Sequence, residues 1–148
     1  MGNEATSADL LMKLYDLRRE ATMREARAWY VGSFFPDSAQ DVMTAMIAAE
    51  TSAFYRMVVT YWDMAATFVN RNAIDEAMFN DVSGECVVVY AKIEPFIDEI
   101  RASMGNPKYL ANLETHLMRM PDAKELLAAR REMIKRWMAA RAEMAKGA

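Results

Sequence analysis

The stretch AQDVMTAMIAAETSAFYRMVVTYWDMAATFVN, residues 39–70, decides the fold class of this chain. Its apolar residues recur at three- and four-residue spacings and cover more than half of a helical circumference. Asp37 or Ser38, just before it, can cap the start of a helix. The pattern predicts one long helix from about Ala39 to Asn70, surrounded by other elements.

Helical spacing continues on both sides of this stretch. Before it, a leucine- and alanine-rich stripe predicts a helix from about Ser7 to Phe35, preceded by a flexible N-terminus at residues 1–6. Pro36 then turns the chain, so the first two helices should form an antiparallel hairpin. After it, a third helix is expected from Asp75 to about Ser103, with a kink at Pro95 because the proline ring displaces the carbonyl four residues back.

Two breaks separate the remaining helices. Asn106 and Pro107 open a short helix, and Asp122 caps a last helix that runs to near the end of the chain. No internal repeat or linker divides the sequence. The sequence therefore predicts an all-α fold, an antiparallel up-down bundle of about five helices forming a single domain over residues 1–148.

The composition is typical of a globular protein that folds without disulfides or metals. Of 148 residues, 53% are hydrophobic and 26% are charged, and 14 are methionine, which predicts a Met-rich, adaptable core. A single cysteine, Cys86, excludes an internal disulfide and favours a reducing compartment. With no secretory signal and no uninterrupted apolar span, we expect a cytoplasmic protein.

Three charges fall on apolar helix faces, where an unpaired charge would be costly. At about 100° per residue, Glu50 lies among apolar side chains of the second helix, Arg24 within the leucine stripe of the first, and Arg130 on the apolar face of the last. Arg24 and Glu50 are about equally far from the Pro36 turn. We therefore expect an Arg24–Glu50 ion pair across the hairpin, with Arg130 as a candidate third member.

Two interpretations of this cluster stay open. It can be a buried ion pair that fixes the register of the helices, or a carboxylate whose acidity the arginines tune inside a ligand pocket. In the second case the pocket would bind a small molecule between helices, with apolar walls that include Phe54, Met57 and Tyr61. A cavity beside Glu50 would favour the ligand.

The residues that catalysis and metal binding require are missing from the sequence. The one histidine, His116, follows Glu114 at the wrong spacing for a di-iron bundle and has no recognisable partner for haem, so we expect it to be half-exposed. Cys86 lacks an adjacent base and is expected to be a small buried hydrophobe. We therefore expect no catalytic residue, no metal ligand and no cofactor, although an enzyme stays open as part of the pocket alternative.

The last helix has a basic edge formed by Lys124, Arg131, Lys135 and Lys146. Residues 122–148 hold seven basic and four acidic residues, a net +3, so the rest of the chain carries −6. Glu132 and Glu143 interrupt this edge, which weighs against contact with nucleic acid or a membrane through this helix.

Apolar residues on two sides of the first helix favour self-association. Leu11, Tyr15 and Trp29 form a second strip there, which another helix or a second subunit would cover. Together with the missing catalytic residues, this predicts a non-catalytic interaction or regulatory module, most simply a homodimer, with a further protein partner as an alternative.

Two segments resemble a known family. FYRMVVTYWDMAATFVNRNAID, residues 54–75, and IEPFIDEIR, residues 93–101, combine an aromatic helix, an Ile-Asp helix start and an aromatic Pro kink followed by Arg. This pattern is similar to that of a family of small bacterial all-helical proteins described as a domain of unknown function. The resemblance implies a bacterial helical domain and carries no chemistry.

Overall fold

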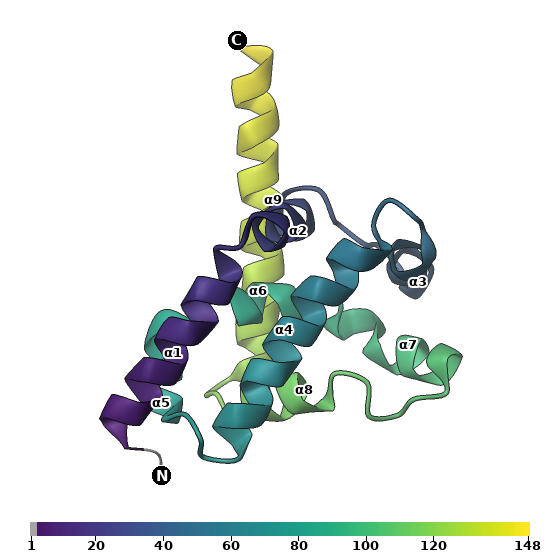
Figure 1. Ribbon diagram of the computed structural model, residues 1–148. Coiled ribbons are helices and arrows are strands. Elements are labelled where there is room, and N and C mark those ends of the chain that lie inside the picture. Colours follow the sequence, from purple (N-terminus) through teal and green to yellow (C-terminus); the bar gives the residue numbers. More distant parts are fainter. Residues whose placement is uncertain (1–2) are drawn as a thin grey trace.

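The computed structural model describes residues 3–148, and every regular element within them is a helix (Figure 1). The all-α prediction is confirmed, but the expected five helices are divided further. In chain order the described residues form α1 (Glu4–Arg18), α2 (Ala21–Gly32), α3 (Ala39–Ile47), α4 (Ser52–Asn70), α5 (Glu76–Val82), α6 (Glu85–Ala91), the 3-10 helix η1 (Glu94–Phe96), α7 (Ile97–Met104), α8 (Ala111–Met118) and α9 (Ala123–Lys146).

The first predicted helix is two helices, because a carboxylate caps a new start in its middle. The side chain of Glu20 accepts hydrogen bonds from the backbone N–H groups of Thr22 at 3.1 Å and Met23 at 2.9 Å, so α2 begins directly after it. Helix α1 begins within the segment expected to be flexible, because the Asn3 side chain accepts from the Ala5 N–H and caps the helix. The flexibility of residues 1–6 stays a prediction. Residues 1 and 2 lie outside the described part of the chain.

The long helix predicted for residues 39–70 also divides. Ala48 is extended, with ψ at 134°, and ends α3. The hydroxyl of Thr51 donates to the carbonyl of Ala45 at 2.8 Å, which satisfies one of the free carbonyls at the end of α3. Residues 48–51 therefore form a turn that changes the direction of the chain before α4.

The predicted third helix is interrupted twice, and the helix ends that follow differ from those expected. One break falls at Ser83 and the other surrounds Pro95, where the expected kink occurs as η1. The Asn106 side chain accepts from Lys108 N–H within a turn, so it does not cap α8. Asp122 has a left-handed φ of 51° and makes no capping bond, yet α9 runs to Lys146 as expected.

The helix α4 lies in the middle of the fold, in contact with α2, α3, α6 and α8. This confirms that it is surrounded by other elements. The side chains that fill the interior are mainly aromatic and branched aliphatic residues, including Tyr30, Tyr55, Trp62 and Phe79. The expected Met-rich core is wrong, because Met23 is the one methionine among residues 3–148 that belongs to the buried core. The up-down order of the helices stays a prediction.

The helix α9 extends well beyond the other elements (Figure 1). Its first half packs against α6 through residues such as Leu127 and Ile134. Its second half carries Trp137 and Met144 with 62% and 77% of their surfaces exposed. The last helix is therefore anchored at one end and open to contacts at the other.

Candidate functional site

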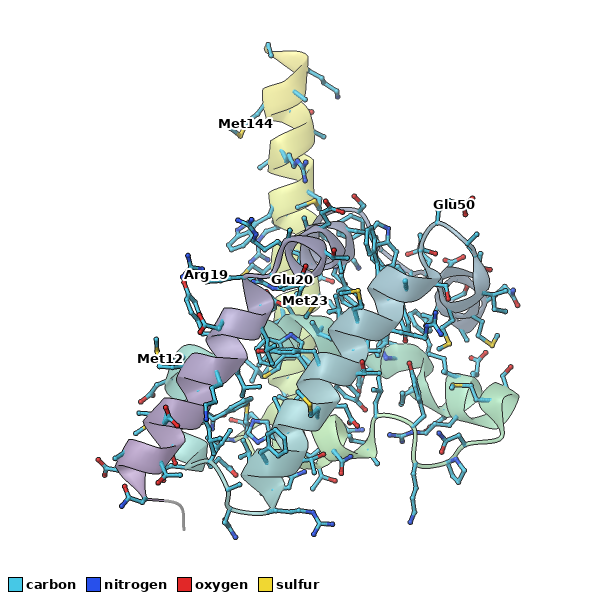
Figure 2. All side chains as sticks on the ribbon, in the orientation of Figure 1. Met12, Arg19, Glu20, Met23, Glu50 and Met144 are labelled. Atoms are coloured by element: carbon cyan, nitrogen blue, oxygen red, sulfur yellow. The ribbon has the colours of Figure 1, made fainter. Side chains whose placement is uncertain are left out.

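The three charges predicted to form one cluster lie apart. Glu50 is exposed at the outer tip of the α3–α4 turn (Figure 2). Arg24 is exposed on α2, and Arg130 is half-buried on α9. Within residues 3–148 none of the three forms an ion pair. The predicted Arg24–Glu50 pair is wrong, because the break at residues 48–51 carries Glu50 off the apolar face and into solvent.

The residues predicted to line a pocket are only partly brought together. Met57 and Tyr61 line an open groove of about 530 Å³, whose acidic group is Glu20. Phe54 lies against the ring of Trp29 instead, with ring centroids 6.4 Å apart. Whether Met57 and Tyr61 contact a ligand stays a prediction, but Glu50 is not beside them.

A partly buried ion pair does exist, between α2 and α6. The guanidinium of Arg27 donates through Nε and Nη2 to the Glu85 carboxylate, with Nη2 at 2.7 Å from Oε2. The indole N–H of Trp62 donates to the same carboxylate at 3.2 Å, so α4 joins the pair. The hydrogen bonds to Glu85 raise the pKa of Arg27. This arrangement fixes the positions of three helices relative to one another.

Lys92 is the most deeply buried cation of the described residues, with 5% of its surface exposed. Its ammonium group donates to the carbonyls of Tyr30, Val31 and Phe34 at 2.6, 3.0 and 2.7 Å, at the end of α2. It also lies 4.2 Å from the centroid of the Phe35 ring. Burial lowers the pKa of Lys92 to about 7. All three of its donors are occupied, so Lys92 caps the C-terminus of α2.

A cavity of about 300 Å³ lies beside Lys92, and its other cations are also paired. Arg131 donates to the carbonyl of Ala91 at 2.9 Å and lies 3.4 Å from the Glu94 carboxylate. Lys135 lies 3.3 Å from Glu132. Each cation that lines this cavity already has a partner within the protein, which makes it a weaker candidate for an anion site.

A second cavity, of about 430 Å³, separates α1 from α4 and α5. At the edge of the cavity α1 and α4 are joined directly, because the hydroxyl of Tyr61 donates to the carbonyl of Leu14 at 2.5 Å. Burial raises the pKa of Tyr61 to about 12, so this hydroxyl keeps its proton at neutral pH. The cavity is lined by Ala8, Leu11, Met12, Leu14, Tyr15 and Arg18 from α1, by Tyr61 and Trp62 from α4, and by Met78, Val82 and Ser83 from α5 and its end.

Arg18 is the charged group of this cavity. Its guanidinium carbon lies 5.4 Å from the ring centroids of both Tyr15 and Trp62. The guanidinium forms no ion pair within residues 3–148, and Arg18 is half-buried. Two aromatic faces therefore orient a cation at an apolar cavity without satisfying its N–H donors.

The single histidine and cysteine are both buried. The expectation of a half-exposed His116 is wrong, because its side chain packs edge-on against Phe79 and none of its surface is exposed. Burial lowers its pKa. Burial raises the pKa of Cys86 to about 12, which leaves a thiol and not a nucleophilic thiolate. No group of three or more potential metal ligands occurs among residues 3–148.

Sequence reasoning considered the apolar stripes of the first helix and did not single out Arg18. Tyr15 and Arg18 are three residues apart, a spacing that places both side chains on one helix face. That signal was available in the sequence. The partner ring, Trp62, comes from a distant helix and could not be assigned without the tertiary structure.

Comparison with known proteins connects the chain to one family. The family model described as a domain of unknown function, DUF4760, matches residues 4–120, which span α1 to α8. Neither a search of curated proteins nor one of solved structures found a match. Within the described residues, no helix combines the length and apolar character that crossing a bilayer requires. Because the match covers most of its length, the chain belongs to the DUF4760 family of domains of unknown function.

Proposed function

We propose that this chain is a non-catalytic helical interaction module that self-associates through the projecting half of α9. The observation that carries the proposal is the exposed apolar surface there. Trp137 and Met144 are 62% and 77% exposed, and Figure 2 places Met144 on the part of the helix that extends beyond the body. Large apolar side chains exposed together on one helix face are typical of a contact surface.

The exposed residues Trp137, Ala140 and Met144 form a seam together with the half-buried Met133. Met133, Trp137, Ala140 and Met144 follow one another at spacings of four, three and four residues, which places them on one side of the helix. Ile134, which is buried against the body, lies about a quarter turn away. The seam can therefore meet a second helix while α9 stays anchored.

Charge selects the orientation of the second copy. In a parallel pair, Trp137 would face its own counterpart, and Arg136 would lie across from Arg141 of the second copy. In an antiparallel pair, Trp137 packs against the small Ala140, and Arg136 lies across from Glu143 of the second copy. Two-fold symmetry repeats this attraction on the other side of the seam. The antiparallel dimer is therefore favoured.

The seam spans twelve residues, or about 18 Å of helix. Isolated helices of this length are marginally stable in water, but here the first half of α9 is already held by the body. The contact is smaller than a standard protein interface, so we expect a weak, concentration-dependent dimer.

A charge exchange tests the proposal. Arg136→Glu and Glu143→Arg should each weaken the dimer in sedimentation velocity, because each places like charges across the seam, and the double variant should restore it. Trp137→Ala should abolish it. If the wild type stays monomeric at all concentrations, or if the double variant is weaker than both single variants, this pairing does not form.

The same variants separate self-association from binding to an anionic surface. A membrane or nucleic acid would bind Arg136→Glu more weakly and Glu143→Arg more tightly, with a steep dependence on salt. Opposite responses of the two single variants would therefore support the surface and contradict the dimer.

We place the module in the bacterial cytoplasm. The buried free thiol of Cys86 supports a reducing compartment, and the resemblance of residues 54–101 to a bacterial family supports the source. A second helical protein that offers a matching seam is the alternative partner.

A further inference from the structure

We infer that the cavity between α1, α4 and α5 binds a small monocarboxylate with an apolar body, and that Arg18 pairs with the carboxylate. This site is separate from α9 and does not depend on self-association. Its volume of about 430 Å³ lies within the range of pockets that hold small ligands.

The walls of the cavity call for an apolar occupant. Leu11, Leu14 and Met78 come from two helices and supply aliphatic surface, while the Trp62 ring forms one side. Met12, which lines the cavity, is 62% exposed and lies on the outward side of α1 in Figure 2. A hydrocarbon chain inserted here would exchange water for these side chains.

Arg18 supplies the polar contact for the ligand, and its positive charge selects a negatively charged group. The guanidinium is held between the rings of Tyr15 and Trp62, each 5.4 Å from its central carbon, and has no carboxylate partner within residues 3–148. A planar guanidinium presents paired N–H donors that match the two oxygens of a carboxylate. The geometry therefore favours an anion over an alcohol or an amine.

The acidic group that shares Trp62 with Arg18 does not cancel this charge. Glu85, which accepts from Trp62, is already paired with Arg27 at 2.7 Å. Arg18, Arg27 and Glu85 together carry one net positive charge, and Arg18 is the member without a partner. A ligand carboxylate would neutralise this charge.

Calorimetric titration with octanoate tests the inference, with octanol and octylamine as probes of equal chain length. Octanoate should bind, and lengthening or shortening it by one methylene should change the affinity about fourfold until the cavity is filled. Octanol should bind at least tenfold more weakly, and octylamine more weakly still. Equal affinity for all three, or no binding of octanoate, overturns the assignment of Arg18.

Two variants locate the site. Arg18→Gln should lower the octanoate affinity at least tenfold, and Arg18→Lys should recover part of it. The matched control is Arg19→Gln, because Arg19 also lies over Tyr15, at 5.6 Å, but does not line the cavity. Ala8→Leu, which fills part of the cavity and leaves Arg18 intact, should also lower the affinity for octanoate. Unchanged affinity in either Arg18→Gln or Ala8→Leu, with unchanged thermal unfolding, places the ligand elsewhere and refutes the inference.

Discussion

Removing the carboxylate of Glu85 should destabilise the protein far more than removing that of Glu76, although both carboxylates hold an arginine in the same way. Glu85 and Glu76 are each the first residue of a short helix, α6 and α5. Each carboxylate accepts hydrogen bonds from the guanidinium of one arginine, Arg27 for Glu85 and Arg119 for Glu76, with a closest N–O distance of 2.7 Å in both pairs. The two pairs differ in burial and in the hydrogen bond from Trp62 that Glu85 alone accepts, so their comparison measures these two effects together.

The magnitude follows from the exposure of the side chains. Breaking a fully buried pair costs about 3–5 kcal/mol, because the remaining charge has no partner. Arg27 and Glu85 retain 26% and 16% exposure, and Trp62 also loses its acceptor. We therefore expect Glu85→Ala to lower the free energy of unfolding by about 2–3 kcal/mol. Arg119 and Glu76 are 38% and 40% exposed, so Glu76→Ala should cost less than about 1 kcal/mol.

Urea unfolding followed by circular dichroism measures both losses, and a thermal scan should show a decrease of roughly 5–10 °C for Glu85→Ala. Both variants lose the same favourable interaction of a carboxylate with a helix N-terminus, so this contribution cancels in the comparison. A double-mutant cycle with Arg27→Ala then isolates the coupling between Arg27 and Glu85. Losses that agree within about 0.5 kcal/mol for the two glutamates would refute the argument from burial.

Three further predictions concern single hydrogen-bonded groups. Asp63 accepts from the Leu113 N–H at 2.9 Å and so caps α8 from α4. In urea unfolding, Asp63→Ala should lower the free energy of unfolding by about 1–2 kcal/mol and Asp63→Asn by clearly less. Equal losses for the two variants would exclude the cap. Ser7 is buried and its hydroxyl accepts from the Asp75 N–H at 2.9 Å, so Ser7→Ala should cost about 1 kcal/mol by the same assay, whereas a neutral effect would show that water replaces it. Burial lowers the pKa of Lys92 to about 7, so above that pH the unfolded chain binds more protons than the folded chain does. The free energy of unfolding of the wild type, relative to that of Lys92→Met, should therefore rise between pH 7 and 9.5. A flat difference would mean that the lysine keeps its proton in the folded state.

The candidate site was predicted poorly, and for a physical reason that Glu50 illustrates. Its placement on an apolar face assumed one uninterrupted helix over residues 39–70. Where a helix breaks, the face predicted for every residue at or beyond the break is no longer valid. Thr51 and Ser52 are residues that favour helix starts, so the turn left a trace in the sequence. The preferences of Thr51 and Ser52 for helix starts are too weak to decide between a continuous helix and a break, because a cap contributes only about 1 kcal/mol.

The sequence by itself determined the helical fold class, the central position of residues 52–70 and the long last helix. These features follow from apolar periodicity, which is a property of neighbouring turns and is readable one segment at a time. Only the tertiary structure decided where the helices divide and which charges meet. The position of a break at Glu20 or Thr51 depends on which faces the rest of the fold buries, and Arg18 reaches its cavity through contacts with Trp62, 44 positions away in the chain. Such contacts depend on packing between distant segments, which no local pattern records.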